Sequence, residues 1–377
     1  MIRVAVVVDS LKVGGAQRLV SAFASNAAPY GILPVIVTLN RARASVISES
    51  IRTAGVKVIT LHASSLFDLR RLRRLIKLFR DEQIDLVQTH LMYANILGTL
   101  AARIARVPVI ATLHSTDVTF GWKPRILKRL EDNFLRRFAT RILAVGNTVA
   151  ETHEGCYGDR KVNVIPNGIP RPEPIQSQAR NRLRKEIAGD ERSSIIITVG
   201  RFTRAKGYED MIKAFSLLRD KTSKPVLLMV GAGSTAKSIK QRIETLHLSQ
   251  SVILTGERSD VPQLLASSDV YASSSHREGL PLAVLEAMMA GLPVVATSVG
   301  DIPNVVTEET GVIVPPHQPK KLAAALENLL KNPKKREAMG KAAQQRAIDE
   351  YSVEAWMKKH LAFYREVLGA SGRDSSS

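Results

Sequence analysis

The 377-residue chain has one cysteine, Cys156, so no disulfide can form within it, and aromatic residues make up only 5% of its composition. No apolar run approaches the roughly 20 residues that a membrane-spanning helix needs. Residues 1–8 lack a basic head and a cleavage site, so they predict a first strand rather than a signal peptide. These absences argue against a disulfide-stabilised secreted protein and a membrane-spanning one, and they favour a reducing compartment.

Acidic residues are scarce in the first half of the chain. Residues 1–185 contain 29 basic and 13 acidic side chains, a net charge of +16, whereas residues 186–377 carry only +3 of the total of +19. This imbalance indicates that the first half meets an anionic partner. Nucleic acid and an anionic membrane surface are the two candidates.

The sequence does contain a regular alternation of β-branched runs with helical patterns. The runs predict twelve strands, which are Ile2–Val8, Val35–Leu39, Val56–Leu61, Asp85–Gln88, Val109–Leu113, Ile142–Val145, Ile195–Val199, Val226–Val230, Val252–Leu254, Val270–Ala272, Val294–Ala296 and Val312–Val314. Alternating strands and helices predict parallel sheets covered on both faces. Twelve strands exceed a typical sheet, so we expect an α/β protein with two doubly wound, Rossmann-like domains of about six strands each, facing across a cleft.

Four prolines within nine residues, at positions 166, 170, 172 and 174, mark the boundary between the domains, because neither a helix nor a central strand persists there. We expect an N-terminal domain at residues 1–170 and a second domain at 171–350. The remainder, 351–377, should contain a helix over Val353–Leu368 and a polar, disordered tail over Ser371–Ser377.

The segment Gly200–Gly207 joins the strand Ile195–Val199 to the helical pattern of Tyr208–Leu218. Arg201 and Lys206 therefore lie beyond the carboxyl end of a strand, where doubly wound sheets bind ligands. An arginine offers a planar fork to phosphate oxygens, and a lysine offers a compact charge. The pair is consistent with a diphosphate clamp, and equally with two solvated surface cations.

A second segment places two carboxylates around a predicted helix start. Glu278 precedes Pro281, which suits a first helical turn, and Glu286 lies about a turn and a half inside. Glu286 has apolar neighbours and needs a hydrogen-bond donor, such as a ribose diol, whereas Glu278 has the simpler alternative role of stabilising the helix dipole. Unpaired main-chain donors that attract diphosphate or sugar oxygens are expected at Gly279, Leu280 and Leu282.

The Glu-x7-Glu spacing of Glu278 and Glu286, downstream of Gly200-Arg201-Phe202 and Lys206-Gly207, resembles the retaining glycosyltransferases of family 4, which have the two-domain GT-B fold. Nearly the whole chain shares the resemblance, because three further motifs match in order: Gly14-Gly15-Ala16, Val164-Ile165-Pro166-Asn167-Gly168 and Gly291-Leu292-Pro293-Val294-Val295-Ala296. The resemblance implies that Arg201 and Lys206 hold the donor diphosphate, that Glu278 contacts the donor sugar and that Glu286 contacts the ribose.

The first domain supplies fewer candidates. His114 follows the strand Val109–Leu113 and matches the position of the family's active-site histidine beside the donor sugar, with Asp117 as a weaker companion. A single histidine after a strand is otherwise more often structural. Gly14 and Gly15 open a predicted helix, whose start attracts anions, and are expected to face the diphosphate as a second jaw.

Three other positions have weaker signals. Gly231 follows the strand Val226–Val230 and is expected to let a base and ribose approach the backbone, and Arg258 is placed for the rim of the base site. Asp9, after the first strand, either binds an acceptor or caps a turn. We see no His, Asp and Glu cluster with metal-ligand spacing, and two cations on the diphosphate would do a metal's work, so we expect neither metal nor cofactor.

Two segments account for much of the positive charge. Residues 68–80 have apolar residues at 69, 72, 75, 76 and 79 on one predicted helical face and cations, including Arg70, Arg71, Arg73 and Arg74, on the other. Residues 122–137 form a second basic segment. The plain interpretation is a helix packed on the sheet with a solvated face. Clustered cations nevertheless attract anionic lipid, so we also expect peripheral attachment to a membrane.

The sequence as a whole predicts a cytoplasmic enzyme at the inner face of the membrane that moves a hexose or N-acetylhexosamine from a nucleotide-diphosphate sugar, UDP-linked first and GDP-linked next, to a lipid-linked or polysaccharide acceptor. A sugar-nucleotide epimerase on the same fold is one alternative, and it would turn over donor without acceptor. A basic nucleic-acid-binding protein is another, but the few aromatic residues are not interleaved with the basic runs.

Overall fold

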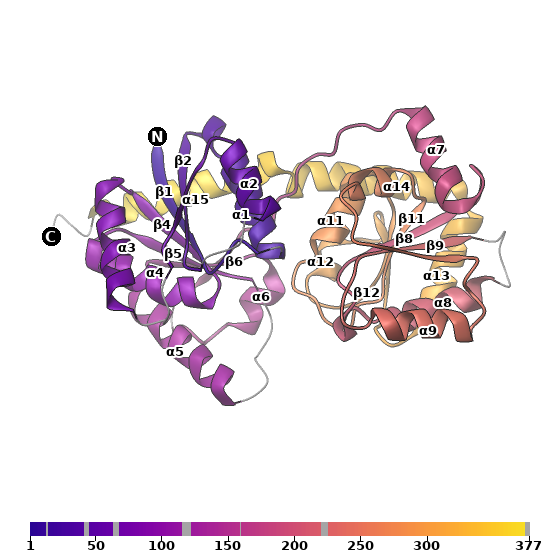
Figure 1. Cartoon of the computed structure of the whole chain (residues 1–377), viewed down its shortest axis with the longest axis horizontal. Coiled ribbons are helices and arrows are strands. Elements are labelled where there is room, and N and C mark those ends of the chain that lie inside the picture. The colour runs from indigo at the N-terminus through magenta and orange to yellow at the C-terminus, as the bar shows by residue number, and fades with distance from the viewer. Residues whose placement is uncertain are drawn as a thin grey trace. The chain divides into compact units, whose positions relative to one another are not determined.

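The computed structural model describes residues 1–12, 14–40, 45–62, 68–114, 122–158, 160–219 and 225–373, apart from the side chains of residues 122–125, 127 and 371–373. The chain forms two compact units (Figure 1). Unit 1 comprises Met1–Pro170 and the segment from Val353 onward, and unit 2 comprises Arg171–Ser352.

Unit 1 is built on a seven-stranded sheet with the order β3-β2-β1-β4-β5-β6-β7, in which every neighbouring pair is parallel. The order reverses between β1 and β4, which is where doubly wound sheets bind ligands beyond their carboxyl edge. The strands are β1 (Ile2–Val8), β2 (Ile32–Thr38), β3 (Lys57–Thr60), β4 (Leu86–His90), β5 (Val109–Leu113), β6 (Arg141–Ala144) and β7 (Val162–Val164).

Helices cover both faces of this sheet. Helices α3 and α4 are in contact and bury one face, while α1 contacts α2 and α15 on the other. The helices of unit 1 are α1 (Gly15–Asn26), the 3₁₀ turn η1 (Ala28–Tyr30), α2 (Val46–Thr53), α3 (Leu69–Asp81), α4 (Met92–Ala105), α5 (Trp122–Phe138), α6 (Asn147–Thr152) and α15 (Val353–Arg373).

Unit 2 repeats the pattern with six parallel strands in the order β10-β9-β8-β11-β12-β13, and the order reverses between β8 and β11. Its central strands are buried on both faces, which explains their continuous apolar runs. The strands are β8 (Ile195–Val199), β9 (Val226–Val230), β10 (Val252–Gly256), β11 (Val270–Ser273), β12 (Val294–Thr297) and β13 (Gly311–Val314).

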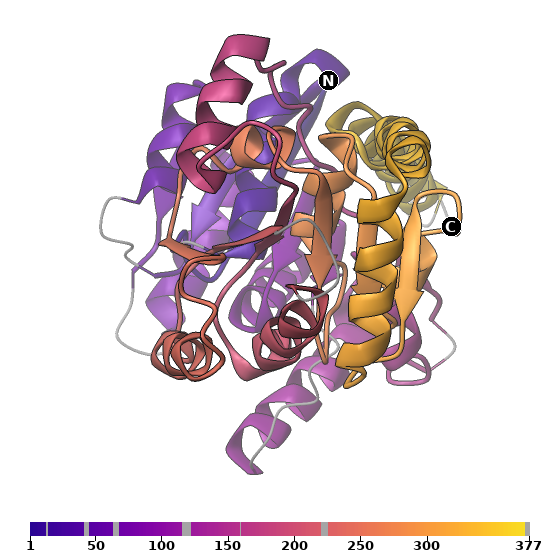
Figure 2. The ribbon, with the colours of Figure 1, turned by 90° about the vertical axis from the view of Figure 1, so that its right-hand side faces the viewer.

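Two helical layers enclose the sheet of unit 2 (Figures 1 and 2). Helices α8, α9 and α13 lie together on one face, and α7, α10, α11 and α14 lie on the other. The helices are α7 (Ser177–Ala188), the 3₁₀ turn η2 (Arg204–Lys206), α8 (Tyr208–Arg219), α9 (Ala236–Thr245), α10 (Val261–Ala266), α11 (Leu282–Met289), α12 (Ile302–Val305), α13 (Pro319–Lys331) and α14 (Pro333–Tyr351).

The C-terminal helix α15 packs on unit 1, to which the sequence did not assign it. Phe23 of α1 meets Trp356 of α15 edge to face at a centroid distance of 5.9 Å, and the buried His360 and Tyr364 continue the same aromatic contact. Gly168 lies against this helix, since a Cβ there would be 2.4 Å from Trp356 Cβ. Burial of this apolar face fixes the returning helix to unit 1.

The predicted α/β class with two Rossmann-like domains is confirmed, while several details were wrong. The sequence missed the short edge strand β7, whose three residues are only half-buried. Helix α15 continues to Arg373, so the predicted disorder from Ser371 is wrong for its first residues, and residues 374–377 lie outside the described part of the chain. No helix in the described ranges combines the length and apolarity needed to cross a bilayer.

Candidate functional site

The loop after β8 presents the predicted cations at the carboxyl edge of the unit 2 sheet. Two main-chain bonds tie it to the end of β9 and to the loop that follows, from Gly200 N–H to Val230 O at 3.0 Å and from Phe202 N–H to Ala232 O at 2.8 Å. The Phe202 ring is buried and anchors the loop in the core. Arg201 is exposed, and among the described residues its guanidinium has no hydrogen bond or ion pair. It is therefore available to an anion.

Gly231 makes this junction between the two loops possible. Its φ of 140° favours glycine, and a Cβ there would lie 2.0 Å from Gly200 O, which is a main-chain atom that cannot swing away. The sequence predicted Gly231 beside the base and ribose. The close approach found here is to the backbone that carries Arg201, so the glycine holds that loop in place.

Lys206 and Glu278 come together from the two loops at the reversal of strand order. Lys206 Nζ lies 2.5 Å from Glu278 Oε1, and the Ser275 hydroxyl donates to the same oxygen at 2.6 Å. Only 24% of the lysine side chain and 11% of the glutamate side chain are exposed. A charged pair is therefore held, partly dehydrated, at the place where such folds bind phosphates.

Glu286 lies on the second turn of α11 and is half-buried. The buried hydroxyl of Tyr271 is influenced by both predicted carboxylates. Burial raises the pKa of Tyr271 well above its ordinary value, and Tyr208, Glu278 and Glu286 raise it further. Both glutamates of the Glu-x7-Glu pattern thus lie within electrostatic reach of one buried phenol.

Helix α11 begins at Leu282, directly after Pro281, and no side chain caps its start. The first main-chain N–H groups of the helix therefore have no partner within it. Gly279 O accepts from Asp301 N–H at 3.0 Å, which fixes the loop, and Leu280 is buried in the core. All three predicted donors here would offer a ligand their main-chain N–H groups, since Gly279 has no side chain and that of Leu280 is buried.

Arg258 departs most from its predicted role. It follows β10, and its guanidinium forms two bonds to Asp260, from Nε to Oδ1 at 2.7 Å and from Nη2 to Oδ2 at 2.6 Å. A bidentate pair of this kind already satisfies the planar fork. A base at this rim would have to share Arg258 with Asp260, so its role as a ligand stays a prediction.

In unit 1, Gly14 precedes α1 and Gly15 is its first residue. Gly14 is extended, with φ −175°, a Cβ there would meet only the mobile end of Gln17, and Gly15 has open space around it. Neither backbone conformation nor packing therefore requires these glycines. Because they have no side chains, the main-chain N–H groups at the start of this 12-residue helix stay accessible, as an anion site needs.

His114 is paired with a second histidine that the sequence did not single out. His90 ends β4, His114 follows the neighbouring β5, and His90 Nδ1 lies 2.8 Å from His114 Nε2. Burial lowers the pKa of His114 to about 4, and burial together with His114 lowers the pKa of His90 well below its ordinary value. Both rings are neutral near pH 7, with one donating to the other. Asp117 lies outside the described residues.

Asp9 caps a helix instead of standing free for an acceptor. Its Oδ1 accepts the Ala94 N–H at 2.6 Å near the start of α4. Burial raises the pKa of Asp9 to about 6, against the lowering effect of the bonds from Ala94 and Tyr93. The structure thus supports the capping alternative for this residue.

The basic helix α3 differs from its prediction at two positions. Arg71 is 4% exposed and its Nη1 donates to Leu39 O at 3.2 Å, so it does not belong to the solvated cationic face. Leu69 is 66% exposed, while Leu78 is buried in its place. Of the four arginines named for this face, Arg70, Arg73 and Arg74 are exposed, as are Lys77 and Arg80 further along the helix.

Helix α5 exposes apolar and basic side chains together. Ile126 and Leu130, one turn apart, are 49% and 45% exposed, and Arg129 beside them is also exposed. Exposed leucine and isoleucine next to arginine are typical of helices that lie in a membrane interface. The side chains of residues 122–125, which the sequence included in this segment, are outside the description.

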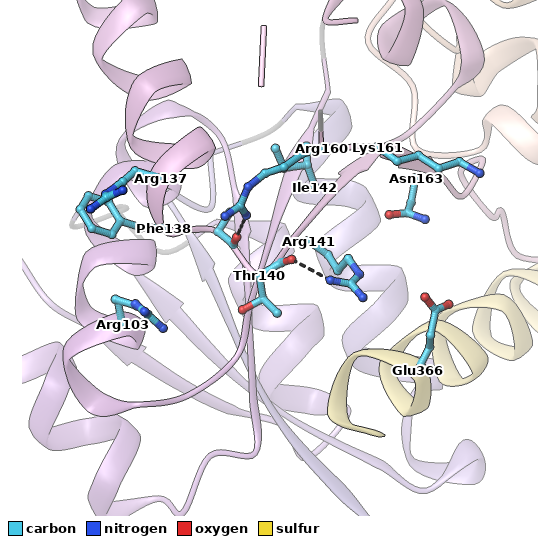
Figure 3. A pocket seen from close by; sticks show the side chains of 11 residues that line it. Arg103, Arg137, Phe138, Thr140, Arg141, Ile142, Arg160, Lys161, Asn163 and Glu366 are labelled. Carbon is cyan, nitrogen blue, oxygen red and sulfur yellow. Dashed lines mark hydrogen bonds between the residues drawn. The ribbon is translucent and has the colours of Figure 1, made fainter. Parts of the chain in front are cut away.

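A cationic pocket of about 540 Å³ opens at the other edge of the same sheet, where β6 and β7 begin (Figure 3). Arg141 donates to Thr140 O at 3.2 Å, and Arg160 donates to Ala139 O. Glu366 of α15 is the one acidic residue among the lining side chains, against five basic ones: Arg103, Arg137, Arg141, Arg160 and Lys161. Ligands of the sheet's switch point bind at the carboxyl edge, so this pocket is separate from that site.

The structure also gathers a cluster that sequence spacing concealed. Asp210, His276 and His317 bring their ligand-type atoms within 4.8 Å of one another. Asp210 lies in the first turn of α8, and the two histidines lie in loops after β11 and β13, so no local motif could have revealed the cluster.

The fold is that of a two-domain transferase with Rossmann-like units, and the comparisons show the class to be glycosyltransferases. Residues 13–171 match the family described as Glycosyltransferase Family 4, and residues 179–346 match Glycosyl transferases group 1. The chain belongs to glycosyltransferase family 4 and is a glycosyltransferase.

Two relatives and one solved structure illustrate what the chain is similar to. The chain is 31% identical over 265 residues to the UDP-Gal:alpha-D-GlcNAc-diphosphoundecaprenol alpha-1,3-galactosyltransferase of Escherichia coli, covering 67% of this chain and 68% of that protein. It is 27% identical to the N-acetyl-alpha-D-glucosaminyl L-malate synthase of Bacillus anthracis, covering 80% of each chain. The structure of Anabaena HepE in complex with UDP and glucose superimposes with a TM-score of 0.84 at 20% identity, covering 97% of this chain and 100% of that one, which shows the shared fold.

Proposed function

We propose that the protein transfers a hexose or N-acetylhexosamine, with retention of anomeric configuration, from a UDP-sugar to a hydroxyl of a lipid-linked or polysaccharide acceptor. The observation that carries the donor half is the convergence of Lys206, Glu278 and the unpaired Arg201 guanidinium at the switch point of unit 2. The Escherichia coli relative, whose name includes a UDP-sugar and a lipid-diphosphate acceptor, and the UDP-bound Anabaena structure support this choice.

The pair Lys206 and Glu278 suggests how donor binding changes the site. Before donor binding, each side chain neutralises the other. An incoming diphosphate competes for Lys206, which frees Glu278 Oε1 to accept a hydroxyl of the donor sugar. Arg201 and the N-terminus of α11 add positive potential at the same diphosphate, while Glu286 takes the ribose diol.

In the transfer step, the bond between the anomeric carbon and the phosphate oxygen breaks toward an oxocarbenium-like state, and the leaving diphosphate gains charge. Cations fixed in advance at that charge lower the barrier most. The acceptor hydroxyl then attacks the same face and gives its proton to the leaving phosphate. We propose no metal for this step, since Arg201 and Lys206 supply the charge, and kcat should be unchanged in EDTA.

Donor binding tests the proposal directly. Titrating UDP-, GDP- and ADP-sugars by calorimetry should identify the UDP series as tightest, and Arg201→Ala and Glu286→Ala should each weaken that binding about tenfold or more. Arg204→Ala, an exposed cation on the same loop, is the matched control and should bind normally. Unchanged affinity in both site variants would put the donor elsewhere. Turnover of donor without acceptor would favour an epimerase, and NMR of the product reports its anomeric configuration.

The acceptor half of the proposal includes peripheral attachment to an anionic membrane through unit 1. The exposed face of α3, the mixed apolar and basic face of α5 and the cationic pocket of Figure 3 all belong to this unit. Each basic residue near an anionic surface contributes about 1 kcal/mol, so three arginines change binding by roughly a hundredfold.

Vesicle sedimentation separates this attachment from a general effect of charge. Replacing Arg70, Arg73 and Arg74 by Gln should strongly reduce binding to phosphatidylserine-containing vesicles. The control replaces three exposed lysines of unit 2, at positions 320, 321 and 334, by Gln. This removes the same charge and should have little effect on vesicle binding. Equal loss in both triple variants, or no loss in the first, would contradict the proposal.

A further inference from the structure

Three side chains of unit 2 form a compact set of nitrogen and oxygen donors beside the proposed donor site. His276 Nε2 lies 2.8 Å from Asp210 Oδ2, and His317 Nδ1 lies 3.7 Å from the same oxygen. The imidazole rings of His276 and His317 face each other at a centroid distance of 3.8 Å and an angle of 38°. Two imidazoles thus converge on one carboxylate oxygen.

These separations suit a tetrahedral ion. Zinc binds histidine nitrogen and carboxylate oxygen at about 2.0–2.2 Å, so donors on neighbouring corners of a tetrahedron are roughly 3.4 Å apart. The two measured distances, 2.8 and 3.7 Å, lie on either side of that value. An ion would replace the proton that His276 and Asp210 now share and would leave one coordination position for water.

We propose that Asp210, His276 and His317 bind a divalent transition-metal ion of the zinc class. Two histidines and one carboxylate are the donor set that such ions favour, whereas magnesium and calcium prefer oxygen alone. The plain alternative is a His276–Asp210 hydrogen bond with His317 stacked on it. His317 has a left-handed backbone, with φ 59°, but four other described non-glycine residues also have a positive φ, so Zn²⁺ binding and not the backbone separates the two arrangements.

The surroundings hold the ligands in place. His276 N–H donates to Ala205 O at 2.8 Å, and the Ser274 hydroxyl donates to Gly207 O at 2.9 Å. Gly207 has a φ of 61°, and a Cβ there would lie 2.1 Å from Ser274 O and 2.7 Å from His276 Nε2. The glycine therefore lets the His276 ring approach the start of α8, where Asp210 lies.

An ion can also reach these ligands. His317 is 67% exposed at its side chain. Asp210 also lines a cavity of about 420 Å³ between α8 and α9, of which neither histidine is part. The exposed ring of His317 therefore provides the entry path that a metal site needs as well as suitable donors.

The position of the ligands gives the ion a structural task. Asp210 lies in the first turn of α8, His276 belongs to the loop after β11 and His317 follows β13, so one ion would join the start of a helix to two loops at the carboxyl edge of the sheet. His276 is two residues from Glu278, and Asp210 is four residues from Lys206. If the proposed donor role of that pair holds, the ion fixes both halves of the clamp and lowers the KM for the donor without taking part in the transfer.

Zinc binding to the full chain is tested without reference to activity. Calorimetry with Zn²⁺ alone, after EDTA treatment and gel filtration, should show one site, with a rise in Tm, and Mg²⁺ should give neither. Co²⁺ should give the visible absorption of a tetrahedral ion with histidine ligands. These readouts separate a failure of the metal site from a failure of the proposed transferase function.

Matched substitutions identify the ligands. His317→Ala and Asp210→Asn should each weaken Zn²⁺ binding at least tenfold and abolish the rise in Tm. His247→Ala is the control, because His247 is an exposed histidine of the same unit with a similarly left-handed φ of 53°, so the backbone effect of alanine is the same. Equal Zn²⁺ affinity in the protein and in His317→Ala would overturn the proposal, as would a loss of binding in His247→Ala of the same size.

Discussion

Lys206 Nζ lies 2.5 Å from Glu278 Oε1, although 72 residues separate them in the chain. The contact exists because β8 and β11 are adjacent in the sheet, at the point where the strand order reverses. The loops after these two strands therefore open at one place. A lysine held there by a carboxylate is poised to exchange that partner for a diphosphate.

Lys206→Ala should lower kcat by about 10²–10³, because the lost ammonium stabilises charge that develops on the leaving diphosphate. Glu278→Gln should lower kcat as well, and the double variant should lose less than the product of the two effects, since the residues act on one another. Steady-state kinetics with a radiolabelled donor measures kcat for each single variant and for the double variant. Lys213→Ala, an exposed lysine of the same unit, is the control. Additive losses would mean that the two residues work independently.

A buried ion pair of unit 2 should matter more to stability than to catalysis. Arg184 is 6% exposed, and its Nη1 and Nη2 lie 3.1 Å from Asp269 Oδ2, which also accepts Ile195 N–H at 2.8 Å. Arg184→Ala leaves the largely buried Asp269 with only the more distant Arg336, whose Nη2 lies 3.9 Å from Oδ1, and should cost about 3 kcal/mol of unfolding free energy. Urea unfolding followed by far-UV circular dichroism measures this. Arg182→Ala, exposed on the same helix, should change stability by less than about 0.5 kcal/mol.

Periodicity and loop position predicted most of the framework but few of the partners. Strands such as β5 and β8 were predicted to the residue, because a parallel strand buried on both faces is a continuous apolar run bounded by polar loops. β7 was missed because three half-buried residues carry no such signal. Lys206 and Glu278 could be placed near one sheet edge from their position after strands.

Partners from distant segments could not be predicted in the same way. The burial of Arg71, the pairing of His90 with His114 and the assembly of Asp210 with two histidines all depend on which loops the sheet order makes neighbours. A helical projection shows only where each residue of α3 lies around the helix axis, and it says nothing of neighbouring segments. It could not show that Leu39 O, from another segment, binds the Arg71 guanidinium.

Gly168→Ala should destabilise unit 1 by about 1–3 kcal/mol, because the new Cβ would lie 2.4 Å from Trp356 Cβ and force α15 outward. Both tryptophans of the chain, Trp122 and Trp356, belong to unit 1, so their fluorescence during urea unfolding reports on this unit. Gly369→Ala is the matched control on α15, since a Cβ there meets nothing within 4 Å. Alanine favours helix over glycine by up to about 1 kcal/mol, so the control should be neutral or stabilising. A neutral Gly168→Ala would show that α15 is held elsewhere.

Acid should destabilise unit 1 at a higher pH than the one that protonates the carboxylates of ordinary ion pairs. His360 is 2% exposed between Phe23, Trp356 and Tyr364, and burial lowers its pKa from 6.5 to about 4. A depressed histidine pKa means that the unfolded chain binds the proton more readily. Stability is therefore complete above pH 6.5 and falls as the pH drops toward 4, by about 3 kcal/mol for this one ring.

Two substitutions should move this acid sensitivity in opposite directions. His360→Phe keeps the aromatic contacts and removes the titration, so the loss of stability between pH 6.5 and pH 4 should shrink by about 3 kcal/mol. Asp9 affects stability in the opposite direction, because folding raises its pKa from 3.8 to about 6. Its contribution to the free energy of unfolding is present at low pH and is lost as the pH rises through 6. Asp9→Asn removes that opposing term, so the acid loss should become larger. Tryptophan fluorescence in urea at pH 4, 5, 6 and 7 measures both slopes, and slopes that shift in the same direction would contradict the assignment of either group.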